Sequence, residues 1–140
     1  PHRWAFDHDE IGYNYRLPNL NAALGCAQLE RLDNFLARKR QVADAYAEVF
    51  SDIDGVQVVA EPNHARSNMW LNALLLNPEN SGARNSILDI TNEAGVMTRP
   101  AWSLLPTLHM YADCPRADLN IAHSLASRLI TLPSSPRLAI

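Results

Sequence analysis

Two stretches of this sequence carry side chains suited to binding an anion or a flat ring. The first contains Tyr13, Asn14, Tyr15 and Arg16, near the start of the chain. An Asn and an Arg two positions apart in a loop can both face an anion. The amide donates through its N–H groups, and the guanidinium donates through a planar charged fork. This pair therefore indicates a binding site for an anion.

The second stretch, from residue 99 to residue 111, combines aromatic, imidazole and guanidinium side chains. Its members are Arg99, Trp102, His109 and Tyr111. Such side chains could line a slot for a sugar or a base, by stacking and by hydrogen bonding. Convergence of the two stretches would make one site, but a single sequence does not show whether they converge.

Structural explanations compete with these functional ones. Loop arginines such as Arg16 are mostly solvated or held in weak surface ion pairs, and a lone histidine such as His109 is more often structural or solvent-facing. Another cluster of possible metal ligands consists of His2, Asp7, His8, Asp9 and Glu10. His and carboxylate side chains bind Zn or Fe. This cluster lacks the fixed helical spacing of specific metal motifs, so we expect no metal site.

The composition is that of a globular domain. The chain has 140 residues, of which 47% are hydrophobic and 19% charged, with a formal net charge of -3. This balance argues against a nucleic-acid-binding surface, and no apolar run is long enough to span a membrane. Two cysteines are too few for a disulfide framework, so we expect a reduced, cytoplasmic setting. Lys39 is the only lysine, which leaves almost no amine for Schiff-base chemistry.

Periodicity predicts an α+β fold with a small, mainly antiparallel sheet and helices on one face. Apolar residues at helical spacing predict one amphipathic helix of about 30 residues from Pro18, roughly 45 Å long. Because that length exceeds the domain, we expect part of the helix to pack against something outside this chain. The other expected elements are strands at 56–59, 69–76, 96–99 and 130–132, helices at 83–94 and 118–129, and an irregular loop at 101–116. Gly55 and Gly95 are expected to end helices.

Both long motifs resemble one protein family. The run from His8 to Pro18, continuing through residues 21–25, closely resembles the start of the small domain in nucleotide-sugar aminotransferases of the DegT/StrS type. The run from Gly95 to Trp102, continuing to Tyr111, is similar to the substrate-side segment of the same family. The sequence of this second run is most similar to the branch of the family that aminates UDP-linked 4-keto-6-deoxy-N-acetyl sugars, of the legionaminic acid and bacillosamine type.

The resemblance implies the C-terminal part of a fold type I aminotransferase that uses pyridoxal 5'-phosphate. Residues 1–17 would be a loop from the end of the large domain, and residues 18–140 the small domain. The large domain, with the Schiff-base lysine, would lie outside this chain, so we expect no catalytic residue here and an inactive fragment. The amino group would pass from an amino acid, usually glutamate, to the C4 ketone of the nucleotide sugar.

The resemblance also implies a homodimer with shared active sites. Asn14 would then contact the cofactor phosphate of the other subunit, and Arg16 would lie near that phosphate or the nucleotide sugar. The other residues expected on the substrate side are Tyr13, His109, Trp102 and Tyr111. Two alternatives remain: a non-catalytic dimerisation or sensor module of the same fold, and a metal-dependent enzyme built on the His2–Glu10 cluster.

Overall fold

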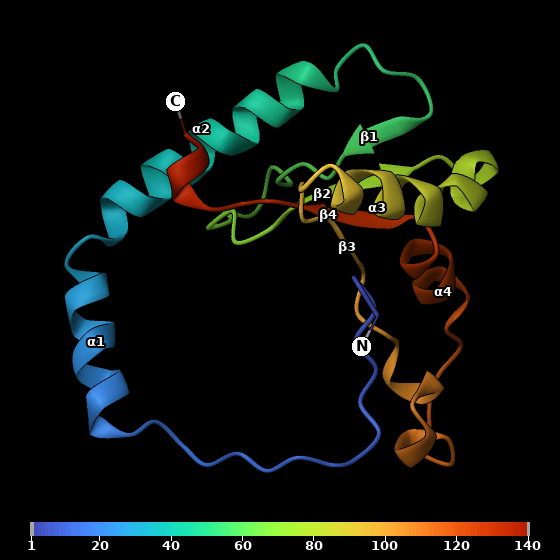
Figure 1. The fold of residues 1–140 in the computed structure, drawn as a ribbon, viewed down its shortest axis with the longest axis horizontal. Coiled ribbons are helices and arrows are strands. Elements are labelled where there is room, and N and C mark those ends of the chain that lie inside the picture. The colour runs from blue at the N-terminus through green and yellow to red at the C-terminus, as the bar shows by residue number, and fades with distance from the viewer. Residues whose placement is uncertain (1, 140) are drawn as a thin grey trace.

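The computed structural model describes residues 2–139 and has the predicted α+β architecture (Figure 1). Pro1 and Ile140, which the domain prediction assigns to the first loop and to the small domain, lie outside the described residues. The elements are α1 (Asn19–Leu29), α2 (Leu32–Val49), β1 (Val56–Val58), β2 (Asn72–Leu76), α3 (Arg84–Glu93), β3 (Arg99–Pro100), α4 (Asn120–Ala126) and β4 (Leu129–Leu132), with four short 3₁₀ helices, η1 (Pro78–Ala83), η2 (Leu105–Thr107), η3 (His109–Tyr111) and η4 (Pro136–Leu138).

The four strands form one antiparallel sheet in the order β1-β2-β4-β3. Leu74 of β2 lies opposite Val58 of β1 and Ile130 of β4. Residues directly opposite one another in antiparallel strands share a face, and alternate residues along a strand do too. Val58, Leu74 and Ile130 therefore point to the same side, together with Leu76 and Leu132.

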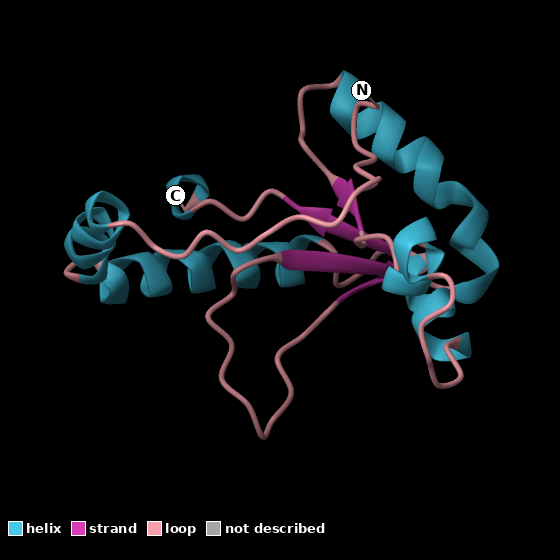
Figure 2. Ribbon diagram, turned by 90° about the horizontal axis from the view of Figure 1, so that it is seen from below, coloured by secondary structure: helices cyan, strands magenta, loops and turns pink. Residues whose placement is uncertain are grey.

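Helices α2 and α3 cover this apolar face and complete the core, as expected. The buried cluster consists of Trp4, Leu74, Leu76, Leu88, Ile130 and Leu132, with Tyr46, Phe50 and Ile87 packed against it. Leu88 of α3 and Ile130 are completely excluded from solvent. Figure 2 shows the long helix α2 running alongside the strands. The rigid part of the molecule is therefore the sheet with these two helices.

The prediction of one continuous N-terminal helix was wrong. The chain turns at Glu30 and Arg31, between α1 and α2. The Arg31 N–H bonds to the carbonyl of Gln28, three residues back, at 3.1 Å, and such a bond tightens and ends a helical turn. Helix α1 has no buried residue, so no packing within this chain holds the two helices on one axis. The apolar spacing continued through the break and concealed it.

The remaining differences are shifts of element boundaries. The second strand begins at Asn72 rather than Met69, the third covers only Arg99 and Pro100, and the last helix ends at Ala126. Leu129, expected on that helix, belongs to β4 instead. Gly95 follows the end of α3 as predicted, with a φ of 81°, a conformation that glycine adopts without steric cost. The prediction that Gly55 ends the long helix was wrong, because α2 ends at Val49 and Gly55, with a φ of 84°, lies in the turn just before β1.

One part of the chain stands away from this core. Residues 8–18, which we call the N-terminal arm, run without regular structure from the sheet to α1, and α1 projects beyond the domain (Figure 1). Leu20 of α1 is 81% exposed. In the part of the chain that the structure describes, no helix is both long and apolar enough to cross a membrane.

Candidate functional site

The segment before the N-terminal arm is fixed to α3. Trp4 is buried, and its indole Nε1 donates to Oδ1 of Asp89 on α3 at 2.8 Å. His2 stabilises the same turn, because its Nδ1 accepts the backbone N–H groups of Trp4 and Ala5 at 3.4 and 3.2 Å. The segment before the arm is therefore positioned by the core, even though it has no regular structure.

Contacts from Arg99 and Ser103 join this segment to the second stretch. The Arg99 guanidinium donates to the carbonyl of Arg3 at 3.0 Å and lies 4.7 Å from the centre of the Phe6 ring. A guanidinium at that distance over an aromatic face is attracted by the ring quadrupole. The Ser103 hydroxyl donates to the Asp7 carboxylate. Residues 3–7 thus meet the second stretch at residues 99–103, whereas Tyr13, Asn14, Tyr15 and Arg16 of the first stretch do not line the cavity at this contact.

A cavity of about 770 Å³ lies where these segments meet. Its walls come from residues 4–8, from the second stretch between Arg99 and Thr107, and from α3, α4 and β4. Trp102 lines the cavity beside Trp70, with ring centres 6.1 Å apart and ring planes at 24°. Trp70 is a site residue that sequence reasoning missed, because it was placed inside a buried strand. The turn-forming pair Ser67-Asn68, separated from Trp70 by Met69, was the available signal.

The predicted anion-binding residues lie elsewhere, on the exposed N-terminal arm. Tyr13 and Tyr15 are 81% and 88% exposed, and Asn14 and Arg16 are exposed as well. The backbone N–H of Arg16 donates to Oδ1 of Asn14 at 2.8 Å, and Arg16 has a φ of 70°. Since its oxygen is used inside the loop, Asn14 retains its amide N–H groups for an acceptor from outside.

The four residues predicted in the second stretch do not all lie at the same place in the structure. Arg99 and Trp102 line the cavity, whereas His109 and Tyr111 are not among its lining residues. The 3₁₀ helices η2 and η3 turn the chain between Trp102 and Tyr111, and His109 is exposed on η3. The structure therefore brings Trp102 together with Arg99, but leaves Asn14, Arg16, His109 and Tyr111 outside this cavity.

The contacts in the structure bear on two other candidate chemistries, metal binding and the use of the Lys39 amine. Across residues 2–139, no group of three or more His, Cys, Asp or Glu side chains is placed to hold a metal ion. Lys39 is committed to structure: its Nζ donates to the carbonyls of Trp70 at 3.1 Å and Ser134 at 2.7 Å. Partial burial lowers the pKa of the Lys39 ammonium. This amine closes a loop onto α2 rather than facing the cavity.

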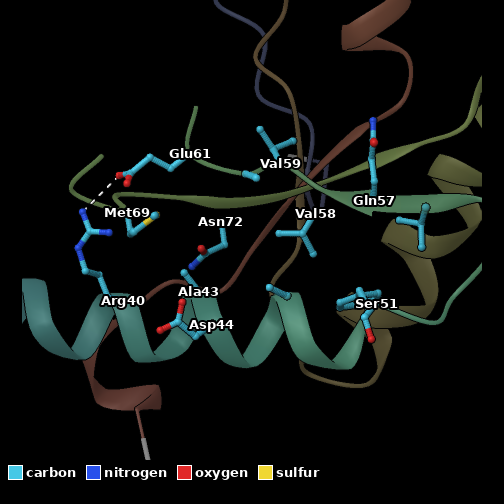
Figure 3. Close-up of a pocket in the computed structure, with 14 residues that line it drawn as sticks. Arg40, Ala43, Asp44, Ser51, Gln57, Val58, Val59, Glu61, Met69 and Asn72 are labelled. Atoms are coloured by element: carbon cyan, nitrogen blue, oxygen red, sulfur yellow. Dashed lines mark hydrogen bonds and ion pairs between the residues drawn. The ribbon is translucent and has the colours of Figure 1, made fainter. Parts of the chain in front are cut away.

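A second cavity, of about 490 Å³, lies between α2 and β1 (Figure 3). Val58 points toward the helix and Gln57 points away from it. At one end Glu61 accepts from Arg40 at 3.2 Å and from the backbone N–H of Ser67. The Ser67 N–H, followed by the Arg40 guanidinium, lowers the pKa of the Glu61 carboxyl. None of the predicted site residues lies here.

This fold and these motifs define a class of protein. Residues 2–140 match the model of the DegT/DnrJ/EryC1/StrS aminotransferase family, and the chain belongs to that family. The GDP-perosamine synthase of Escherichia coli O157:H7 is 38% identical to it over 134 residues, which are 94% of this chain and 35% of the relative. The GDP-perosamine synthase of Vibrio cholerae is 33% identical over 132 residues, 94% of this chain and 36% of the relative. The chain thus spans about a third of the length of these relatives.

Solved structures agree with the fold. The Helicobacter pylori aminotransferase PseC superposes with a TM-score of 0.79 at 21% identity, over 92% of this chain and 35% of its own. DesI, determined in the presence of its TDP-sugar product, superposes with a TM-score of 0.77 at 27% identity, over 84% of this chain and 31% of its own. The α+β arrangement derived from sequence periodicity is therefore that of known aminotransferases.

Proposed function

We propose that this chain is the C-terminal part of a pyridoxal-phosphate-dependent aminotransferase. The whole enzyme would transfer an amino group from an amino acid, glutamate in our proposal, to the C4 ketone of a nucleotide-linked keto-deoxy sugar. Residues 1–17 would be the loop leaving the large domain, and residues 18–140 the small domain. Membership of the aminotransferase family and the coverage of about a third of each relative support this assignment.

One observation carries the proposal: the N-terminal arm presents Asn14 and Arg16 away from the core that this chain builds for itself. An amide donor and a guanidinium suit a phosphate dianion, because hydrogen bonds to ionised groups are short and strong. Helix α1 follows with apolar side chains exposed, such as Leu20 and Leu24. Exposed apolar surface of this kind marks a contact with another protein surface.

The residues present fit the phosphate end of the cofactor and not its reactive carbon. Pyridoxal phosphate, when bound, supplies the electron sink for amino transfer. Asn14 and Arg16 would hold its phosphate and fix its orientation. The sole lysine, Lys39, is bonded to two backbone carbonyls, so the amine that binds the cofactor would come from the large domain.

In the proposed homodimer each active site is shared. The N-terminal arm would cross to the other subunit, where Asn14 contacts the cofactor phosphate and Arg16 with Tyr13 lies near the nucleotide sugar. On the substrate side, Trp102 is supported by its place in the cavity wall. His109 and Tyr111 would need their positions completed by the large domain or by the partner subunit, because neither lines this cavity.

The similar proteins differ in the nucleotide that their names give to the substrate sugar. The second motif resembles the branch that uses UDP-linked N-acetyl sugars, whereas the two perosamine synthases are named for GDP. A Campylobacter jejuni relative named UDP-4-amino-4,6-dideoxy-N-acetyl-beta-L-altrosamine transaminase is 30% identical over 93 residues. We therefore propose a UDP-linked 4-keto-6-deoxy-N-acetyl sugar as substrate, to be assayed beside its GDP-linked counterpart.

The first test compares this chain with the intact protein that contains it. With glutamate and pyridoxal phosphate, the intact protein is expected to aminate the 4-keto sugar, as followed by mass spectrometry of the product. The 140-residue chain alone should do neither this nor bind the cofactor covalently. A visible absorption band from covalently held cofactor in the isolated chain would refute the proposal that the cofactor-binding lysine belongs to the large domain. An intact protein that dimerises without activity would support the non-catalytic dimerisation or sensor module instead.

The second test addresses the shared site. In the intact enzyme, Asn14→Ala should weaken cofactor retention, because a donor to the phosphate is lost. Mixed dimers are formed between this variant and a subunit whose Schiff-base lysine is replaced. If Asn14 acts across the interface, the defect falls on the site of the partner subunit. A defect confined to the mutated subunit's own site would rule out the crossing arm. Glu30→Gln, at the exposed C-terminal end of α1, is the control.

A further inference from the structure

Trp70 and Trp102 form an exposed aromatic pair on the rim of the large cavity. They come from the segment before β2 and from the second stretch, and their ring planes are within 24° of parallel. Trp70 is 65% exposed and Trp102 is 68% exposed. Large aromatic side chains are usually among the most buried residues of a domain. Two indoles left open and nearly parallel at a cavity therefore need an explanation that core packing does not supply.

The backbone holds Trp70 in this position by specific contacts. Its N–H donates to Oδ1 of Asn68 at 3.0 Å, and its carbonyl accepts from Nζ of Lys39 on α2 at 3.1 Å. The preceding residue, Met69, has a φ of 50°, a left-handed conformation that costs a non-glycine residue free energy. The chain thus keeps a strained turn that leaves the Trp70 ring exposed.

Two guanidiniums, those of Arg84 and Arg99, line the same cavity together with the carboxylate of Asp7. The Arg84 guanidinium donates to the Ala126 carbonyl and to Oδ1 of Asn85. The Asp7 carboxylate already accepts the hydroxyl of Ser103. Arg99 uses its Nη1 to bind the Arg3 carbonyl, which leaves further guanidinium N–H groups for an anion. Two flat rings and the Arg99 guanidinium in the lining of one cavity suit a base joined to phosphates better than a neutral sugar.

We propose that Trp70, together with Trp102, forms the stacking platform for the nucleobase of the nucleotide-sugar substrate, with Arg99 facing the diphosphate. This inference deepens the proposed function and rests on it for the identity of the substrate. Trp70 is then a residue that determines affinity for the nucleotide half. The sugar ring is left free to reach the reacting groups supplied by the rest of the enzyme.

Calorimetric titration of the intact protein with UDP, GDP and inorganic pyrophosphate tests the platform directly. Stacking on an aromatic side chain strengthens binding of a base by about 1–3 kcal/mol, so Trp70→Leu is expected to weaken UDP and GDP binding roughly tenfold. Pyrophosphate binding should not change, because that probe has no base. Trp70→Phe keeps a ring and should recover most of the affinity. Ile90→Ala, which removes an exposed apolar side chain on α3 outside the cavity, is the control.

The same variants in the sugar assay separate this inference from the proposed function. With an active enzyme, Trp70→Leu should raise KM for the nucleotide sugar about tenfold and leave kcat unchanged, as loss of uniform binding does. Unchanged UDP affinity in a folded Trp70→Leu protein, or an equal loss of pyrophosphate affinity, overturns the stacking role. Loss of UDP affinity in a protein with no aminotransferase activity keeps the platform and overturns the proposed function.

Discussion

The N-terminal arm with α1 and the sheet with α2 differ in what holds them in place. In the sheet region, Leu88 and Ile130 are completely buried and the three strand pairs are antiparallel with defined register. In the arm and α1, no residue is buried. The comparison teaches that this chain builds a packed core and a second region that buries none of its residues against that core. The candidate phosphate ligands lie in that second region.

The largest expected effect separates the two regions by stability. Leu88→Ala should lower the free energy of unfolding by about 2–5 kcal/mol, because it leaves a cavity in a fully packed site. Leu24→Ala on α1 should change it by less than about 0.5 kcal/mol, since that side chain is 64% exposed. Urea denaturation of the 140-residue chain measures both. Equal losses for the two variants would mean that α1 packs on the core in solution, contrary to the comparison.

Sequence reasoning succeeded for the region that packs on itself. The apolar run that predicted a strand at 69–76 and the helical spacing of Ile87 and Leu88 reflect burial, and burial is what the hydrophobic pattern reports. It failed at Glu30 and Arg31, because the apolar spacing of α1, which buries no residue in this structure, continues across the break. For such a helix, the spacing of apolar residues specifies which face is apolar, but it does not specify whether the helix axis stays straight.

The candidate site was predicted in part for a related reason. Residue types identified Trp102 and Arg99, which do line one cavity with residues 4–8. The path of the second stretch could not be derived, because η2 and η3 depend on local hydrogen bonds such as that from the Thr107 N–H to the Leu104 carbonyl. His109 was therefore expected beside Trp102 and lies outside that cavity. The roles of Asn14 and Arg16 stay predictions, because both side chains are exposed on the arm and face no ligand within this chain.

A smaller effect tests the boundary between the two regions at α2. The Tyr46 hydroxyl donates to the carbonyl of Pro133 at 2.9 Å, which ties α2 to the end of β4. Tyr46→Phe should therefore cost about 0.5–1.5 kcal/mol at neutral pH, the usual value of one such bond. Tyr13→Phe on the exposed arm should cost nothing measurable, and urea denaturation compares the two.

The pH dependence of this variant has a defined sign. Burial raises the pKa of the Tyr46 phenol above its ordinary value of 10.0, so the folded state resists ionisation more than the unfolded state does. The stability that Tyr46 contributes is complete below pH 10 and is lost as pH rises through the raised pKa. The difference between wild type and Tyr46→Phe should shrink above pH 10. A difference that stays constant from pH 8 to about 11 would show that the phenol is not buried against the end of β4.

The smallest expected effect is found in a comparison of the N-terminal arm with the loop between β1 and β2, neither of which has regular structure. Unlike the arm, the loop between β1 and β2 is closed by Glu61, which accepts the Ser67 N–H and the Arg40 guanidinium. The Ser67 N–H and Arg40 lower the pKa of Glu61 below its ordinary 4.5. Its contribution is present above that value and is lost as pH falls through the lowered pKa. Glu61→Gln should therefore be slightly less stable than wild type at pH 7 and lose less stability on acidification. Glu30→Gln, at the exposed end of α1, should follow the wild-type acid profile. If both variants behave alike, the loop's own hydrogen bonds do not distinguish it from the arm.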